Sequence, residues 1–212
     1  MDCPLCKSSS AAEFSKANSK LYYRCSECRL IFLDSSHYPT PDEEEERYNT
    51  HNNDPGDERY ISHIKQLTNK MLPYLKDGDT GLDFGSGLGK PVEHILVKNG
   101  YSVYSYDPFF FDHKDLLGNK YDFITCIETA EHFHTPGKEF DLLNTLLKPS
   151  ALLGIMTNIF SDHIDFDEWW YPRDPTHVCF YSAETFKWIS DCYSWDILSQ
   201  SDNVIIFQAS QS

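Results

Sequence analysis

Asp83 and the three glycines that follow it at alternate positions, Gly85, Gly87 and Gly89, have the types and spacing of a ligand-binding loop. Asp83 ends an apolar run and a proline follows the loop, so the pattern predicts a buried strand, a tight turn and a helix. Glycines let the backbone approach a ligand closely, and the N–H groups at a helix start favour an anionic group. The spacing departs from the dinucleotide motif GxGxxG, because Lys90 stands where the third glycine would fall. We therefore expect a cofactor loop of another kind.

A second acid, Asp107, ends the next segment of strand pattern, residues 101–107, and Pro108 terminates it. A carboxylate at the end of the second strand beyond a glycine loop is in position to accept hydrogen bonds from two ribose hydroxyls. This placement would serve any ligand that contains adenosine. Only fourteen residues separate Asp107 from Asp122, so we expect the following helix and strand to be shortened.

Four cysteines form two Cys-x-x-Cys pairs, CPLC and CSEC, with eighteen residues between the pairs. This spacing is typical of a four-thiolate structural zinc site, and a segment this small could not hold itself together by apolar burial alone. We predict a zinc ribbon over residues 1–34, with the metal held by Cys3, Cys6, Cys25 and Cys28. A closed site with four protein ligands leaves no position for a substrate, so its expected role is structural.

The glycine loop, read as D-x-G-x-G-x-G, resembles the first motif of class I S-adenosylmethionine-dependent methyltransferases. Residues 120–133, KYDFITCIETAEHF, resemble the fourth motif in the E-x-x-E-H form, seen in ubiquinone-pathway O-methyltransferases and small-RNA 2′-O-methyltransferases. The resemblance covers residues 57–212 and points to the ubiquinone-methylase-like branch. It implies S-adenosylmethionine as cofactor, bound by Asp83, Gly85, Ser86, Gly87, Gly89, Asp107 and Ile127.

The same resemblance implies a possible second metal site. In the two groups with the E-x-x-E-H motif, the matching residues can bind a divalent cation near the acceptor oxygen; here they are Glu128, Glu131 and His132. Such a cation could lower the pKa of an acceptor hydroxyl. The alternative is a metal-free site, in which the glutamate reaches a helix N-terminus and the histidine packs beside the cofactor.

Residues 159–182 are rich in aromatics and acids and follow the expected fifth strand, so they should lie over the site where the methyl group is presented. Trp169, Trp170 and Tyr171 offer flat apolar area, and Arg173, Asp174 and His177 offer polar groups. The catalytic candidates are His132 and His177, either of which could act as a general base. His177 could instead be a fourth ligand of the second metal. The alternative is that residues 174–177 form an ordinary turn whose histidine caps the next helix.

The elements that must position these residues follow from the apolar periodicity. Strands and helices alternate from residue 79 to the end, which predicts an α/β, Rossmann-like, mostly parallel sheet closed by an antiparallel C-terminal strand. A helix over residues 59–75 should precede this sheet, and the zinc ribbon should precede both. Residues 35–56 carry prolines and a run of four glutamates, so we expect an acidic linker or a lid in which His37, Tyr48 and His51 could cover the site. The methyltransferase domain should span 57–212.

Composition limits the possible partners and locations. The formal net charge of −15 and the lack of a cluster of Lys and Arg make a nucleic-acid partner unlikely, because such partners are bound mainly through their phosphates. The chain has no apolar stretch long enough for a membrane span and no export signal at its start, so we expect a cytoplasmic protein without a membrane partner. The seven cysteines then favour metal binding or free thiols over disulfides. Nothing in the sequence indicates an oligomeric state.

These inferences predict transfer of a methyl group from S-adenosylmethionine to an oxygen or carbon of a small-molecule acceptor, with His132 or His177 as base. Two alternatives stay open. One is an RNA methyltransferase that grips RNA with the zinc ribbon. The other is a catalytically silent protein that binds the cofactor or docks a partner through the ribbon.

Overall fold

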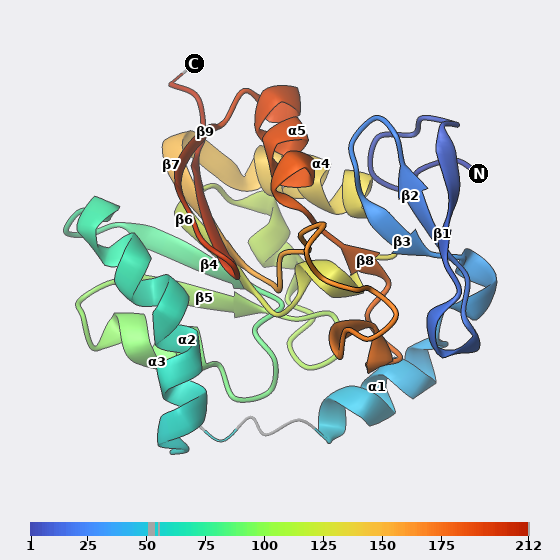
Figure 1. Ribbon diagram of the computed structural model, residues 1–212. Coiled ribbons are helices and arrows are strands. Elements are labelled where there is room, and N and C mark those ends of the chain that lie inside the picture. Colours follow the sequence, from blue (N-terminus) through green and yellow to red (C-terminus); the bar gives the residue numbers. More distant parts are fainter. Residues whose placement is uncertain (51–53, 55, 212) are drawn as a thin grey trace.

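The computed structural model describes residues 1–50, 54 and 56–211. His51, one of the predicted lid residues, lies outside them. The described chain folds around two sheets, a six-stranded sheet that carries most helices and a smaller four-stranded sheet built mainly by the N-terminal segment (Figure 1). Within these residues, no helix has both the length and the apolar character needed to cross a membrane.

The six-stranded sheet has the strand order β5-β4-β6-β7-β10-β9. Its first four strands are parallel, and β10 runs antiparallel to both β7 and β9. This confirms the predicted Rossmann-like, mostly parallel sheet with an antiparallel end. The strand bounds are β4 Thr80–Phe84, β5 Ser102–Tyr106, β6 Tyr121–Ile127, β7 Leu147–Met156, β9 Asp196–Gln200 and β10 Val204–Gln208.

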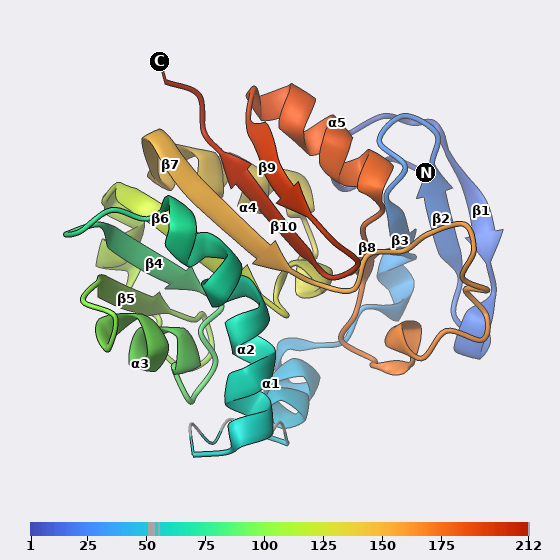
Figure 2. The ribbon, with the colours of Figure 1, turned by 60° about the vertical axis from the view of Figure 1, so that its left-hand side comes forward.

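Helices cover both faces of this sheet, as Figure 2 shows. Because side chains alternate along a strand, each buried strand supplies two cores. Phe123 and Ile127 of β6 pack with helices α2 (Glu58–Met71) and α3 (Pro91–Val97). Ile124 and Cys126 pack with α4 (Pro136–Leu146) and α5 (Ala183–Tyr193) on the other face. The near-continuous apolar character of the central strands follows from this double burial.

The four-stranded sheet joins the N-terminal segment to the aromatic segment after β7. Its strands are β1 Ala11–Ser15, β2 Tyr22–Cys25, β3 Ile31–Leu33 and β8 Cys179–Phe180, in the order β1-β2-β3-β8. Strand β8 comes from the aromatic segment after β7 and pairs antiparallel with β3. The N-terminal residues also share one continuous apolar cluster with the α4 and α5 face of the large sheet.

The acidic segment differs from the predicted linker, because residues Pro41–Asn49 form helix α1. Thr40 caps the helix: its side chain accepts from the N–H of Glu43, whose carboxylate accepts from the N–H of Thr40. Such a capping box, together with Pro41 in the first turn, stabilises a helix start. Arg47 then fixes the helix to the rest of the fold through Asp174, 2.6 Å from the carboxylate. The run of glutamates is therefore helical.

Short 3₁₀ segments complete the described elements: η1 Ala17–Ser19, η2 Ser35–His37, η3 Leu72–Tyr74, η4 Lys114–Gly118, η5 Ala130–His132 and η6 Tyr171–Arg173. Between β5 and β6, η4 stands where a larger sheet of this kind would carry a helix and a further strand. The connection between β5 and β6 is therefore short, as expected from the sequence.

Gly137 provides a test of how the N-terminal segment docks. Its N–H donates to the carbonyl of Pro4, and an added Cβ would lie 2.5 Å from the carbonyl oxygen of Leu5. Gly137→Ala should therefore push the N-terminal segment away from α4 and lower the free energy of unfolding by about 1–3 kcal/mol, measured by urea denaturation. The matched control is Gly118→Ala, whose Cβ would meet nothing within 4 Å. Equal stability of the two variants would contradict this description of the docking.

Candidate functional site

A cavity of about 1060 Å³ opens where β4, β5 and β6 end. Residues that follow each of these strands line it, among them Gly85, Asp107 and Glu128, and α1, α2 and the aromatic segment after β7 complete its walls. Carboxyl ends of parallel strands meet at one edge of a sheet, which is where ligands bind in open α/β folds. The volume is slightly above the usual range of about 300–1,000 Å³ for a pocket that holds one ligand.

The glycine loop between β4 and α3 is held against the neighbouring strand. The N–H groups of Gly85 and Ser86 both donate to the carbonyl of Tyr106. Gly85 has φ +79°, and an added Cβ would lie 2.3 Å from the Thr129 side chain. The loop thus needs glycine at this position for two reasons, the backbone conformation and the close approach of the loop after β6.

Two buried acids flank the loop. Asp107 accepts from the N–H of Gly87 at 2.9 Å and from the N–H groups of Phe109 and Phe110. Asp83 accepts from the Thr125 hydroxyl at 2.7 Å, and burial raises the pKa of this carboxyl to about 7. Asp107 therefore ties the glycine loop to the loop after β5, in addition to facing the cavity.

Six of the predicted cofactor residues line the cavity and one does not. Gly89 is not among the lining residues; the six that are comprise Asp83, Gly85, Ser86, Gly87, Asp107 and Ile127. Phe109 and Phe110 also line the cavity, whereas Phe111 lies beneath the ammonium group of Lys90, 3.6 Å from the ring centroid. Only part of the phenylalanine run therefore faces the ligand space.

The two predicted catalytic histidines lie together on the far wall of the cavity. Their ring centroids are 4.8 Å apart. Nδ1 of His132 lies 3.0 Å from the carbonyl oxygen of Thr176, and Nδ1 of His177 lies 2.9 Å from that of Tyr171. A carbonyl oxygen can only accept, so each Nδ1 carries the proton, and Nε2 of each neutral ring is then an acceptor.

Glu131 lies behind this pair and is fully buried. Its Oε1 accepts from the Tyr171 hydroxyl at 2.5 Å, and Tyr171 also contacts the Thr157 hydroxyl at 2.9 Å. Its Oε2 has no hydrogen-bond partner among the described residues. Burial, followed by the nearby charge of Glu128, raises the pKa of the Glu131 carboxyl well above its usual value.

The structure groups the candidate metal ligands differently from the predicted set. Ligand atoms of Glu131, His132 and His177 lie within 4.8 Å of one another. Glu128 lies outside this group: its Oε1 is 3.3 Å from Nε2 of His63 on α2, and this contact raises the pKa of the imidazole. Glu128 also has a φ of +46°, a strained conformation of the kind found at functional sites.

The polar residues predicted in the aromatic segment separate into two groups. Asp174 lines the cavity and accepts from Thr176 and Arg47; these bonds outweigh burial, so the pKa of its carboxyl lies below the usual value. Arg173 is exposed and donates to the carbonyl of Glu168 instead. Trp170 reaches the cavity, whereas Trp169 packs into the aromatic cluster around Phe166.

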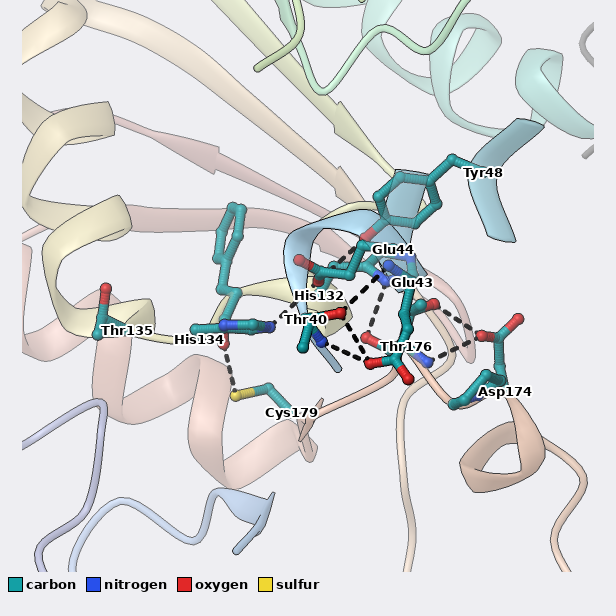
Figure 3. Close-up of polar contacts among 12 residues, drawn as sticks. Thr40, Glu43, Glu44, Tyr48, His132, His134, Thr135, Asp174, Thr176 and Cys179 are labelled. Carbon is teal, nitrogen blue, oxygen red and sulfur yellow. Dashed lines mark hydrogen bonds and ion pairs between the residues drawn. The ribbon is translucent and has the colours of Figure 1, made fainter. Parts of the chain in front are cut away.

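Among the acids and histidines of the lining, four were not expected from the sequence as part of the site: Glu44, His63, His134 and Glu139. Glu44 lies 3.1 Å from Nε2 of His134, and Tyr48, one turn further along α1, contacts both Glu44 and the ring of His132 (Figure 3). The signal for Glu44 was present, because Thr40 and Glu43 match a capping box and a helix starting there puts residues 44 and 48 on one face.

The four N-terminal cysteines form a second, separate cluster. The Cys3 and Cys28 sulfurs lie 3.5 Å apart, as do those of Cys6 and Cys25, and all four lie within 4.8 Å of one another. A disulfide would need about 2.05 Å, whereas tetrahedral thiolates at about 2.3 Å from zinc stand about 3.8 Å apart. After each pair, the next residue has a positive φ and donates its N–H to the first cysteine of the pair. The donor set and its geometry fit a zinc ion.

Comparison with known proteins identifies the six-stranded part of the chain. A family model described as a methyltransferase domain matches residues 57–200. None of the curated proteins compared with the chain matches it. Several solved structures share the fold at low sequence identity, three of which are described below.

The chain resembles a 1,6-didemethyltoxoflavin N1-methyltransferase from Burkholderia thailandensis, solved with its substrate and S-adenosylhomocysteine. The TM-score is 0.59 and the identity 12%, over 94% of this chain and 100% of that one. Magnesium protoporphyrin IX methyltransferase from Synechocystis PCC 6803, solved with S-adenosylhomocysteine, matches with a TM-score of 0.56 and 14% identity, over 71% of this chain and 84% of that one. A SAM-dependent methyltransferase from Methanosarcina mazei matches with a TM-score of 0.51 and 16% identity, over 68% of this chain and 98% of that one. At these identities the likeness shows the fold.

Gly85→Ala tests the glycine loop as the cofactor site. The new Cβ would collide with Thr129 and force a positive φ on alanine, so the affinity for S-adenosylhomocysteine in calorimetry should fall at least about tenfold. Gly100→Ala is the matched control, since Gly100 also has a positive φ, +91°, but no atom lies within 4 Å of its Cβ position. That variant should lose stability and keep its affinity. Unchanged binding by Gly85→Ala would separate the loop from the cofactor.

Proposed function

Because the chain belongs to the family of methyltransferase domains, we propose that it transfers the methyl group of S-adenosylmethionine to a hydroxyl oxygen or a carbon of a small molecule. The observation that carries this proposal is the meeting of the glycine loop and the histidine pair in one cavity. S-adenosylmethionine, when bound, supplies a methyl group already activated on a sulfonium. The chain must then orient the acceptor, remove its proton and exclude water.

The residues around the loop fit the cofactor. A side chain at position 85 would collide with Thr129, so the loop keeps its path along the cavity only with glycine there. Asp107 uses two oxygens for three backbone donors, and a carboxylate can accept about four hydrogen bonds, so capacity is left for a ribose hydroxyl. Phe109 and Phe110 beside it offer apolar area for a base.

His132 and His177 are the candidates for the general base. Each ring holds its proton on Nδ1 against a backbone carbonyl, so Nε2 is the atom that would take a proton from the acceptor. Tyr171 fixes His177 in two ways, by its carbonyl and by ring contact at 4.2 Å between centroids. Glu131 lies behind both rings and could stabilise the imidazolium that forms.

A divalent cation is the alternative role for the same residues. One carboxylate oxygen and two imidazole nitrogens within 4.8 Å form a donor set that suits zinc, iron or manganese and leaves coordination positions for an acceptor oxygen. The Oε2 of Glu131, without a hydrogen-bond partner in the described chain, supports this reading. In that case the histidines would be ligands, and the cation would lower the pKa of the acceptor hydroxyl.

The N-terminal cysteines are proposed to hold a structural zinc ion. All four positions would be filled by thiolates, so the ion would stabilise the ribbon and take no part in the reaction. The ribbon lies against the aromatic segment through β3 and β8. Its proposed role is therefore to hold one wall of the acceptor site.

The two other functions considered from the sequence have less support. An RNA substrate would need cations for its phosphates, and no lysine or arginine is among the described residues that line the cavity. A silent interaction protein would have no use for two histidines with matching tautomers beside a cofactor loop. The small-molecule acceptor remains the best supported.

Replacing each histidine tests whether the pair takes part in the reaction. His132→Ala or His177→Ala should lower kcat by about 10²–10⁴, whichever is the base, with unchanged affinity for S-adenosylhomocysteine. The measurement is methyl transfer from radiolabelled cofactor to a panel of hydroxylated aromatics and sugars, with calorimetry in parallel. Normal turnover in both variants would contradict the proposed site.

The same assay separates the two roles of the histidines. With a cation, turnover should depend on added magnesium, manganese or zinc, and Glu131→Gln should weaken that dependence. With a histidine base, turnover should be independent of added metal and should rise with pH through the pKa of one imidazole.

Zinc content tests the ribbon. Elemental analysis should give one zinc per chain, and Cys25→Ser should reduce it and destabilise the protein, because a ribbon of this size depends on its metal. Hydrogen exchange should then increase in Cys179–Phe180, which pairs with β3, and stay low in β4 and β5. A zinc content far below one per chain would exclude this site.

A further inference from the structure

The charge of the cavity lining is one-sided. Its described residues include four histidines but no lysine or arginine, together with six acids: Glu44, Asp83, Asp107, Glu128, Glu139 and Asp174. The nearby cations are engaged elsewhere: Arg47 binds Asp174, and Lys90 lies over the ring of Phe111. An acceptor that carries a carboxylate or a phosphate would lose the hydration of that group and would gain no lysine or arginine partner from the described lining.

Two of these acids form a wall that the proposed reaction leaves unexplained. Glu44 of α1 and Glu139 of α4 line the cavity together with His134. Glu44 is only 7% exposed and lies 3.1 Å from Nε2 of His134, with the Tyr48 hydroxyl at 3.4 Å (Figure 3). Oε1 of Glu139 accepts from the Thr135 hydroxyl, whereas Oε2 is buried and has no hydrogen-bond partner among the described residues. Glu44 is thus in contact with the imidazole of His134, and Glu139 adds a second carboxylate to the same lining.

Stability does not account for this wall. Burying a carboxylate is unfavourable, and a buried ion pair is generally no more stabilising than apolar residues of similar size. Helix α1 is already held by its capping box and by the contact between Arg47 and Asp174. The acceptor capacity left at Glu139 points instead to a donor that the described residues do not supply.

We propose that Glu44, His134 and Glu139 form a subsite for an amine or hydroxyl group of the acceptor, so that cationic and neutral acceptors are taken and carboxylates and phosphate esters are rejected. This inference rests on the proposed function for the identity of the ligand as a methyl acceptor. It adds the chemical class of that acceptor and assigns Glu44 as a specificity-determining residue.

The position of the wall favours the acceptor over the cofactor as its ligand. Apart from Ile127 at the end of β6, the cofactor residues that line the cavity lie at the ends of β4 and β5 or in the loops after them, whereas His134 and Glu139 come after β6 and Glu44 comes from α1. Tyr48 connects the two regions, because its ring contacts His132 at 5.2 Å and Phe109 at 5.1 Å between centroids. A molecule on the wall can thus reach the histidine pair past one aromatic ring.

A matched set of small probes tests the subsite. Benzylamine, benzyl alcohol and benzoate share a ring and differ in charge, and their binding to the full-length protein saturated with S-adenosylhomocysteine can be measured by ligand-observed NMR. Benzylamine should bind most tightly and benzoate least. Glu44→Gln should reduce the preference for benzylamine over benzoate about tenfold, the size of one charge-assisted hydrogen bond. Glu45→Gln removes the same charge from an exposed position on the same helix and should leave the preference unchanged.

Each other outcome overturns the inference. The inference requires that benzylamine or benzyl alcohol binds and that benzoate binds more weakly than benzylamine. It also requires that Glu44→Gln changes this preference more than Glu45→Gln does. If Glu44→Gln instead weakens S-adenosylhomocysteine in calorimetry, the wall belongs to the cofactor. Failure of the wild-type protein to bind S-adenosylhomocysteine would contradict the proposed function itself, and this is a separate measurement from the probe preference.

Discussion

Val178 uses both of its backbone groups to join the two halves of the molecule. Its carbonyl accepts from Leu33 at the end of β3, and its N–H donates to the carbonyl of Glu131 beside the histidine pair. The residue is fully buried, so neither bond can be replaced by water without exposing the core. Through this residue, the N-terminal sheet, the aromatic segment and the loop after β6 are held in one register. The position of His177, the preceding residue, follows from it.

The site depends on the polar side chains that are buried beside Val178. Glu131, Tyr171 and Thr157 form a buried network in which Tyr171 contacts both of the others. Such networks are stable only when their members are satisfied, and one oxygen of Glu131 is not satisfied by the described chain. The Glu131 carboxylate, one oxygen of which has no hydrogen-bond partner among the described residues, lies within 4.8 Å of ligand nitrogens of both histidines. Burying it therefore lowers stability at the position where a proton or a cation would be used. The strained backbone of Glu128 nearby is consistent with the same local demand.

Helix α1 changes the meaning of the acidic segment. On an exposed loop, four consecutive glutamates would be solvated and would contribute only to net charge. In the helix, they point in different directions, and one of the four, Glu44, is buried against His134 while Glu45 and Glu46 remain exposed. The helix also brings Tyr48 onto His132 and Arg47 onto Asp174. A segment expected to be a linker or a lid thereby contains a helix that forms one wall of the cavity.

Much of the large sheet could be predicted from the sequence, because its signals are local. The apolar runs around Asp83 and Ile124, the glycines of the loop and the turn at residues 201–203 specify strands and turns by short-range pattern, and the family match and fold agree with them. The paired spacing of the cysteines likewise predicted a cluster of four sulfurs, and the four lie within 4.8 Å of one another. These features depend on neighbours within a few residues, where periodicity and turn chemistry are reliable.

The composition of the site depended on contacts between residues far apart in the chain. The sequence grouped Glu128 with Glu131 and His132 and offered His177 as a further ligand, whereas the fold turns Glu128 toward His63 on α2 and leaves Glu131, His132 and His177 together. The fold also pairs β3 with β8 in one sheet, although most of the chain separates these two strands. The sequence alone therefore determined the glycine loop, the alternation of strands and helices in a mostly parallel sheet, and the cysteine pairs. Only the tertiary structure decided which acids and histidines share a cavity, because side-chain direction and long-range pairing follow from packing that no short pattern records.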